Sequence, residues 1–374
     1  MVLTEPLTKQ ERMNLYWLTR ISGFGAVTIN KIWNAVQKKE EIYNIEGMFL
    51  KEKGILSGNQ EQAFDAFRKQ DMRQKIEEEY EGLKEQKIRF FTPFDEEYPR
   101  GLRMIHNRPM GLFCKGTMPD NQRFCAAIVG ARECSSYGSH VARMLAKELS
   151  SMGIQVISGL ALGVDGASHR GALEAGKPTY GVLGCGINIC YPKENYPLFE
   201  KMEKEGGILS EYGMGEKPKP ANFPMRNRII SGIADVVIVV EAREKSGSLI
   251  TAELALEQGK DVFAVPGRIT DMLSSGCNHL IQSGAFPLLC IDDILDYFGM
   301  KHGKIQGIQE KKQKGLAKKE KMVYSCLDFE PRHIEEIALR TGLSVSQSMD
   351  ALLELELGGY AVRTAGLYYT KRLF

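Results

Sequence analysis

The stretch from Asn222 to Gly267 contains a loop whose residue types favour an anion. Lys245, Ser246, Gly247 and Ser248 lie between a β-branched run, residues 236–240, and an apolar pattern with helical spacing. A loop of small residues at a helix N-terminus presents free backbone N–H groups and the positive end of the helix dipole. We therefore predict that this loop binds phosphate, with Ser246 or Ser248 capping the helix.

A ring, two guanidinium groups and an amide lie just upstream of that loop. Phe223 can stack on a base, and Arg226 and Arg228 can each form paired hydrogen bonds to a phosphate. Asn227 adds an amide that can bind the backbone or a base edge. A phosphate joined to a base is the ligand that this set fits. The alternative for Asn227 and Arg228 is that they tie their helix to the sheet.

Strand patterns alternate with helical patterns from about residue 88 to residue 299. Val236–Val240 and Val262–Val265 enclose a helical pattern, which predicts a βαβ unit with parallel strands. The strand candidates are Cys125–Val129, Gln155–Ser158, Thr179–Leu183, Ile208–Glu211, Val236–Val240, Val262–Val265 and Leu288–Ile291. This alternation predicts an α/β fold with an extended Rossmann-like, doubly wound and mainly parallel sheet.

Ligands of such sheets bind beyond the carboxyl ends of the strands, where the following loops also carry suitable residues. After the first strand, Gly130 permits close backbone approach and Arg132 can grip a phosphate with two hydrogen bonds. Ser135 or Ser136 can cap the next helix and donate to phosphate. We expect all four to contribute to the same site as Phe223.

Two more loops are expected at the same edge. The loop after the second strand brings Gly159 and other small residues close, and the loop after the third contributes Lys193 as a nearby cation. Asp165 and His169 are four residues apart on one helix face, so an acid–base pair is conceivable. The favoured alternative is an aspartate near the helix N-terminus and a histidine that packs in the core.

The familiar cofactor motifs are missing from these loops. Gly184 and Gly186 would begin a dinucleotide fingerprint, but Ile189 stands at the third glycine position. No Gly-Lys-Ser/Thr follows a glycine run, so a Walker A loop is absent. The eight cysteines form no CxxC pair, which favours free thiols. We expect no cofactor, no metal and no catalytic residue.

Composition restricts the location and the partners. The net charge is only +2, so affinity for nucleic acid must come from local clustering of cations. The N-terminus has no apolar core of a signal peptide, and the longest apolar run, residues 236–240, is too short to span a bilayer. We therefore expect a cytoplasmic protein that does not bind a membrane.

Residues 1–87 are predicted to form a small N-terminal all-α domain of helix-hairpin-helix (SAM-like) type. Gly23 and Gly25 would make the tight turn of the hairpin. Backbone amides of such a hairpin can hold a DNA phosphate. A plain helical hairpin that packs on its neighbour is the alternative, because the flanking charge is mixed.

The C-terminal part is predicted to begin with a linker and end in a winged-helix-like domain. Residues 300–321 form a basic, Lys-rich linker, since residues 301–321 contain eight lysines and two glutamates. Residues 322–374 follow the order of a winged helix. Its candidate reading helix, Ser344–Leu355, carries Asp350 and Glu354 but no Lys or Arg, so we expect this domain to bind protein or regulate assembly rather than to read duplex DNA.

Five blocks of this sequence, in this order and spacing, resemble the DprA/Smf DNA-processing family. They are GARECSSYG, SGLALGVDGASHRGAL, GVLGCGINICYPKENYPLF, the block from residue 223 to residue 267, and GCNHLIQSGA. The resemblance covers residues 98 to about 296, an α/β domain expected at 88–299. It implies a protein of natural transformation that protects incoming single-stranded DNA, loads the RecA recombinase and forms a homodimer through this domain.

The resemblance also implies site residues. Phosphate binding falls on Arg132 with Ser135, and on Lys193, Lys219 and Lys245 as cations, while Phe223 would stack on a base. A competing hypothesis is a nucleotide-processing, phosphoribohydrolase-like enzyme that uses Arg132, Arg226 and Glu241. Such enzymes carry a Pro-Gly-Gly-x-Gly-Thr loop, whereas this chain has residues 245–248 in its place.

Overall fold

The computed structural model describes residues 6–300, 317–327, 331–358, 360–364 and 366–371. The chain divides into two compact units, Met1–Ile291 and Asp292–Phe374. Among the described residues, no helix combines the length and the apolar character needed to cross a membrane.

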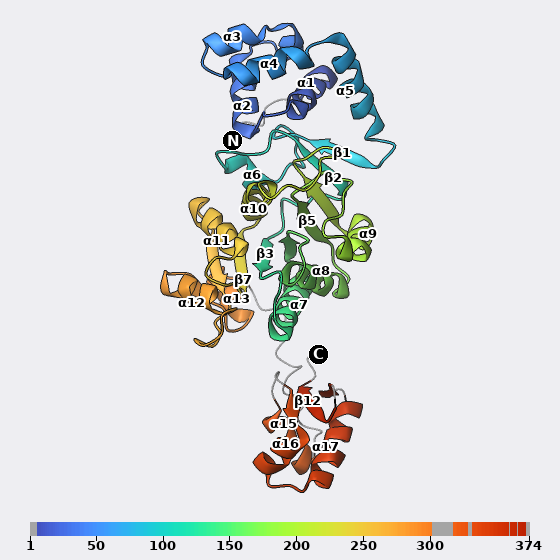
Figure 1. Ribbon diagram of the computed structural model, residues 1–374, viewed down its shortest axis with the longest axis vertical. Helices are drawn as coiled ribbons and strands as arrows, with labels where there is room; N and C mark the ends of the chain where they lie inside the picture. The colour runs from blue at the N-terminus through green and yellow to red at the C-terminus, as the bar shows by residue number, and fades with distance from the viewer. Residues whose placement is uncertain (1–5, 301–316, 328–330, 359, 365, 372–374) are drawn as a thin grey trace. The chain divides into compact units, whose positions relative to one another are not determined.

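A nine-stranded sheet forms the centre of the first unit (Figure 1). Its strands are β1 Ile88–Phe91, β2 Leu112–Gly116, β3 Cys125–Gly130, β4 Gln155–Ser158, β5 Thr179–Leu183, β6 Gly207–Ser210, β7 Val236–Val240, β8 Asp261–Ala264 and β9 Phe286–Pro287. Their order is β1-β2-β6-β5-β4-β3-β7-β8-β9, and all pairs from β6 to β9 are parallel. The predicted doubly wound, mainly parallel sheet is confirmed.

Two details of the strand prediction differ from the structure. The predicted strand Leu288–Ile291 is wrong, because β9 comprises only Phe286 and Pro287 and a helix follows at Asp292. The antiparallel strands β1 and β2 were not predicted. A charged residue interrupts the apolar run of β1 and another ends that of β2, so neither has the continuous apolar run that is typical of central parallel strands.

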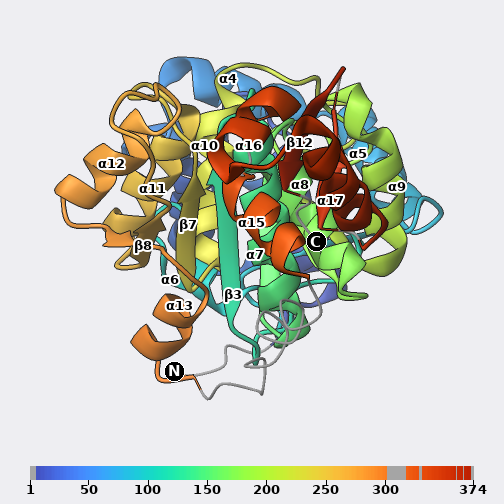
Figure 2. The same ribbon diagram turned by 90° about the horizontal axis from the view of Figure 1, so that it is seen from below.

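Helices cover both faces of the sheet, as Figures 1 and 2 show. One face is covered by α7 Ser136–Ser151, α8 Val164–Glu174 and α9 Tyr196–Glu205, and the other by α6 Arg100–Met104, α10 Asn222–Ile233, α11 Gly247–Glu257 and α12 Ser275–Gln282. Neighbouring strand residues point to opposite faces, so Val182 and Leu183 belong to different apolar clusters. Both faces of the central strands are therefore buried.

The N-terminal helices pack on the same sheet. They are α1 Lys9–Arg20, α2 Ala26–Ala35, η1 Lys39–Asn44, α3 Gly47–Glu52, α4 Gly58–Phe67 and α5 Gln70–Gly82. The ring of Tyr16 on α1 lies 5.2 Å from that of Phe90 on β1 and 5.9 Å from that of Phe113 on β2. Gly23 has a φ of 82° in the turn between α1 and α2, as the predicted hairpin requires. The helices and the sheet thus share one core.

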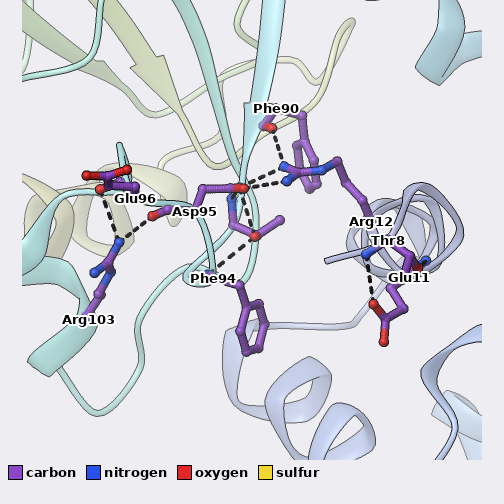
Figure 3. A network of polar contacts seen from close by, with 9 residues as sticks. Thr8, Glu11, Arg12, Phe90, Phe94, Asp95, Glu96 and Arg103 are labelled. Carbon is purple, nitrogen blue, oxygen red and sulfur yellow. Dashed lines mark hydrogen bonds and ion pairs between the residues drawn. The ribbon is translucent and has the colours of Figure 1, made fainter. Parts of the chain in front are cut away.

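An ion pair fixes α1 to the loop after β1 (Figure 3). The guanidinium of Arg12 donates two hydrogen bonds to Asp95 and one, at 3.3 Å, to the carbonyl of Phe90. Asp95 also accepts from the N–H of Thr92 at 2.7 Å. Burial opposes the ionisation of Asp95, but the hydrogen bonds from Arg12 and Thr92 outweigh it and hold its pKa below the ordinary value.

The second unit contains a winged helix. The elements of this second unit are α13 Asp292–Tyr297, α15 Lys318–Cys326, β10 Arg332–His333, α16 Ile334–Thr341, α17 Val345–Leu357, β11 Ala361–Arg363 and β12 Tyr368–Lys371. The predicted linker is too long at its end, because Lys318–Lys321 form the first turn of α15. The side chain of Glu320 accepts from the N–H of Ala317 at 2.7 Å and so begins that helix. The rest of the predicted linker, residues 301–316, lies outside the described residues.

We predict that Asp95→Asn lowers the free energy of unfolding by about 2 kcal/mol at pH 7, because it leaves Arg12 half-buried without its anion. The folded-state pKa of Asp95 is depressed, so the stabilisation is present above the ordinary value of 3.8 and is lost as pH falls below it. Urea unfolding at pH 7 and at pH 3 measures this. Glu96→Gln, an exposed neighbour, is the control, and an equal deficit for Asp95→Asn at both pH values would contradict the account.

Candidate nucleic-acid interface

A crevice opens at the carboxyl ends of β3 and β7. The chain leaves β3 toward β4, β5 and β6 on one side and returns through α10 to β7 on the other side of β3. This is the point where the strand order reverses, so the loops after β3 and β7 run to opposite sides of the sheet. Open α/β sheets bind ligands in the gap between two such loops. Gly130 pairs with Val240 at this edge, and a pocket of about 670 Å³ lies above them.

Most of the predicted site residues line this pocket. They come from the loop after β3, the first turns of α10 and the loop that leads from β7 into α11. They are Gly130, Arg132, Phe223, Arg226, Asn227, Lys245, Ser246, Gly247 and Ser248. The structure therefore brings together segments that are more than a hundred residues apart in the sequence.

Phe223 lies close to two guanidinium groups and a second aromatic ring. The guanidinium carbons of Arg132 and Arg226 lie 5.3 Å and 5.9 Å from the centre of its ring. The ring of Tyr191 lies 5.7 Å away at an angle of 34°. A Cβ on Gly184 would lie 2.8 Å from the Phe223 ring, so only glycine leaves room for the ring there. This cluster offers a surface for base stacking beside donors for phosphate.

Arg226 is buried and already holds the protein backbone. Its guanidinium donates to the carbonyls of Gly159 and Val182, and its Nε donates to the Asn227 side chain at 3.1 Å. Burial lowers the pKa of Arg226, and the neighbouring carboxylate of Asp165 opposes that shift. Arg226 therefore holds the backbone that shapes the pocket and also contributes positive charge to the pocket.

Gly159 does not line the pocket. A Cβ at this position would lie 2.5 Å from Nη1 of Arg226 and 2.6 Å from Oδ2 of Asp165. Asp165 accepts from the N–H of Gly159 at 3.2 Å and from that of Ala161 at 3.4 Å. Gly159 therefore makes room for the side chains of Arg226 and Asp165 rather than for a ligand.

The N-terminus of α11 forms one wall of the pocket. Ser246 caps this helix, since its Oγ accepts from the N–H of Ser248 at 3.4 Å and lies 2.8 Å from the Ser248 Oγ. Lys245 is exposed beside it. The positive end of the helix dipole and an exposed ammonium group together make this wall suitable for a phosphate.

Ser135 and Ser136 lie apart from that wall. Ser135 caps α7, and both its N–H and its hydroxyl donate to the carboxylate of Glu241, the N–H at 2.8 Å. Its donors are therefore engaged within the protein. Ser136 lines a separate hollow of about 450 Å³ that also includes Arg132 and Arg143.

Three predicted cations are outside the pocket. Lys193 is exposed in the short helix η2 Lys193–Asn195, and Lys219 is exposed and paired with Glu216. Arg228 is buried on the opposite face of α10, where it donates two hydrogen bonds to Glu211 at 2.7 and 2.8 Å. Its alternative role, tying the helix to the sheet, is the one that the geometry supports.

Two pocket residues with aromatic or basic side chains were not predicted from the sequence. Tyr191 stands in the loop after β5 and is 45% exposed, so its ring is available beside Phe223. Arg243 is exposed two residues before Lys245. Both lie in loops that the sequence had identified, and an aromatic or basic residue in such a loop is the signal that could have found them.

His169 is not part of an acid–base pair. It is fully buried, and its Nδ1 lies 2.8 Å from the Thr179 hydroxyl. That hydroxyl donates to the carbonyl of Val156, so the histidine nitrogen is the donor. Burial lowers the pKa of His169 to about 3, which keeps the ring neutral. Within the described ranges, no group of three or more His, Cys, Asp or Glu residues could hold a metal ion.

We predict that Arg228→Lys lowers the free energy of unfolding by about 2 kcal/mol, because an ammonium cannot form the paired contact with Glu211. Affinity for a single-stranded oligonucleotide should change by less than about twofold. The matched control is Arg132→Lys, which is exposed and should change stability by less than about 0.5 kcal/mol. Denaturant unfolding and fluorescence anisotropy measure the two quantities. A fully stable Arg228→Lys variant with weakened binding would contradict the structural role.

Comparison with known proteins identifies relatives of both units. A model of the family described as DNA recombination-mediator protein A matches residues 89–299, and a model of the DprA winged helix domain matches residues 309–366. The chain is similar to the DNA processing protein DprA of Streptococcus pneumoniae, with 44% identity over 213 residues, 57% of this chain and 75% of that protein.

Two solved structures are similar as well. The Streptococcus pneumoniae DprA structure matches with a TM-score of 0.66 and 36% identity, covering 78% of this chain and 98% of that one. The Helicobacter pylori DNA processing protein A, solved to describe its single-stranded DNA binding mode, matches with a TM-score of 0.50 and 31% identity over 56% of this chain and 95% of its own. On these matches, the chain belongs to the DprA/Smf family of DNA-processing, recombination-mediator proteins.

Proposed function

We propose that this protein binds single-stranded DNA in the crevice between β3 and β7. The observation that carries the proposal is the Phe223 ring, which has the guanidinium groups of Arg132 and Arg226 within 6 Å of its centre and shares the pocket with the N-terminus of α11. The Helicobacter pylori relative, which binds single-stranded DNA, supports the same ligand here.

A single strand suits this crevice better than a duplex does. Its bases are not stacked within a helix, so one can turn onto the rings of Phe223 and Tyr191 while the adjoining phosphates meet cations. Arg132, Arg243 and Lys245 are the exposed cations around the pocket. Every base has a face that can stack on an aromatic ring, so we expect little sequence preference.

We predict that the double variant Arg132→Glu, Lys245→Glu binds a single-stranded oligonucleotide with a flatter salt dependence. Each lost phosphate contact should reduce the slope of log affinity against log salt by about 0.7. The two losses together should therefore reduce it by about 1.4. Fluorescence anisotropy over a salt series measures the slope.

The matched control is Lys177→Glu, Lys204→Glu, which makes the same change in net charge. Both lysines are exposed and precede strands β5 and β6, so they lie at the opposite edge of the sheet. We expect this control to keep the slope of the unaltered protein. Equal slopes for the two double variants would mean that net charge, and not the crevice, accounts for binding.

We further propose that the bound strand is protected and then passed to a RecA recombinase by a cytoplasmic homodimer formed through the Rossmann-like domain. Membership of a recombination-mediator family supports this step. The test is assembly of RecA filaments on single-stranded DNA, which the protein should accelerate and the crevice double variant should not.

We propose no catalytic step. A phosphoribohydrolase would need Glu241 to face its substrate, but the carboxylate of Glu241 is bound by Ser135, and Glu241 is not among the residues lining the pocket. Arg226, the second residue of that hypothesis, is engaged with the carbonyls of Gly159 and Val182. Release of free base from nucleoside monophosphates by the purified protein would favour the enzyme instead.

A further inference from the structure

Glu241 directly follows the strand β7 and is buried in an unusual backbone conformation. Its side chain is only 5% exposed, and its φ of 54° lies in the left-handed region, which residues other than glycine rarely adopt. Such a conformation is strained and persists only where the surrounding structure holds it. The contacts of Glu241 show what holds it.

Glu241 holds both ends of the segment that carries Arg132. Its main-chain carbonyl accepts from the N–H of Ala131 at 2.8 Å. Its carboxylate accepts from the N–H of Ser135 at 2.8 Å and from the Ser135 hydroxyl. Arg132 lies between these two attachment points, so its main chain is held by the residue that follows β7.

Gly138 leaves room for the carboxylate of Glu241. A Cβ on Gly138 would lie 2.2 Å from the Glu241 Oε2, so any larger residue there would displace the carboxylate. Gly138 is in the first turn of the sixteen-residue helix α7, whose positive end is thereby occupied by an anion of the protein itself. The Glu241 carboxylate repels a phosphate at that helix end, whereas the N-terminus of α11 lines the pocket.

We propose that Glu241 is a positioning residue for DNA binding. It acts as an internal anion at the N-terminus of α7, fixes Arg132 beside Phe223 and leaves the N-terminus of α11 as the phosphate site. The proposal rests on the proposed function, single-stranded DNA binding in the crevice, and assigns it a residue that does not itself touch DNA.

Long-range charge and the positioning of Arg132 predict opposite changes in DNA affinity when the Glu241 carboxylate is removed. Removal of a carboxylate near a DNA site tightens binding if only long-range charge matters. If Glu241 positions Arg132, Glu241→Gln should instead weaken binding of a single-stranded oligonucleotide about tenfold, because an amide cannot accept from both donors of Ser135. The matched control is Glu244→Gln in the same loop, where the side chain is exposed and the affinity should be unchanged or up to about twofold tighter.

A double-mutant cycle with Arg132→Ala separates positioning from a general loss of structure. If Glu241 acts through Arg132, Glu241→Gln should change affinity by less than about twofold in the Arg132→Ala background. Gly138→Ala, which displaces the same carboxylate from the other side, should weaken binding as Glu241→Gln does. Thermal unfolding of each variant establishes that the measured protein is folded.

Tighter binding by Glu241→Gln, or a full tenfold loss in the Arg132→Ala background, would overturn the positioning role while leaving the crevice as the DNA site. Absence of oligonucleotide binding by the unaltered protein would overturn the proposed function and this inference together. The two failures are therefore distinguishable in one set of measurements.

Discussion

The parallel pairing of β7 with β3 is the constraint on which the site depends. The two strands are joined along five residue pairs, from Ala126 with Val236 to Gly130 with Val240. A Cβ on Gly130 would lie 1.9 Å from the Val240 carbonyl, so the two strand ends meet in direct backbone contact. Most of the residues that line the pocket lie on the segments that follow these two strand ends or on α10, which brings the chain back between them, and others come from the loops after β4 and β5. The chemistry of the crevice thus follows from the topology of the sheet.

Ion pairs and hydrogen bonds within the protein determine which cations remain available to bind DNA phosphates. Arg228 is paired with Glu211, and the Asp165 carboxylate opposes the shift that burial imposes on Arg226. The positive end of α7 is occupied by Glu241. Within the described part of the chain, Arg132, Arg243 and Lys245 form no ion pair, and all three line the pocket. A protein with a net charge of only +2 can therefore concentrate positive charge at one place.

Much of this arrangement could be predicted from the sequence. The predicted strands Val236–Val240 and Thr179–Leu183 have their observed bounds, because central parallel strands are buried on both faces and form short apolar runs. The loops of the site followed from the rule that ligands bind beyond the carboxyl ends of strands. The direction of each side chain did not follow. Arg228 turns to Glu211 and Ser135 to Glu241, and each partner lies on a separate strand end whose position depends on the whole sheet.

The central claim is that a single strand lies in the crevice with a base on the Phe223 ring. Photochemical crosslinking of an iodouracil-substituted oligonucleotide, followed by mass spectrometry of the peptides, tests this most directly. The account predicts crosslinks on peptides that contain Tyr191 or Phe223. Crosslinks confined to the N-terminal helices, to the winged-helix unit or to the opposite edge of the sheet would contradict it.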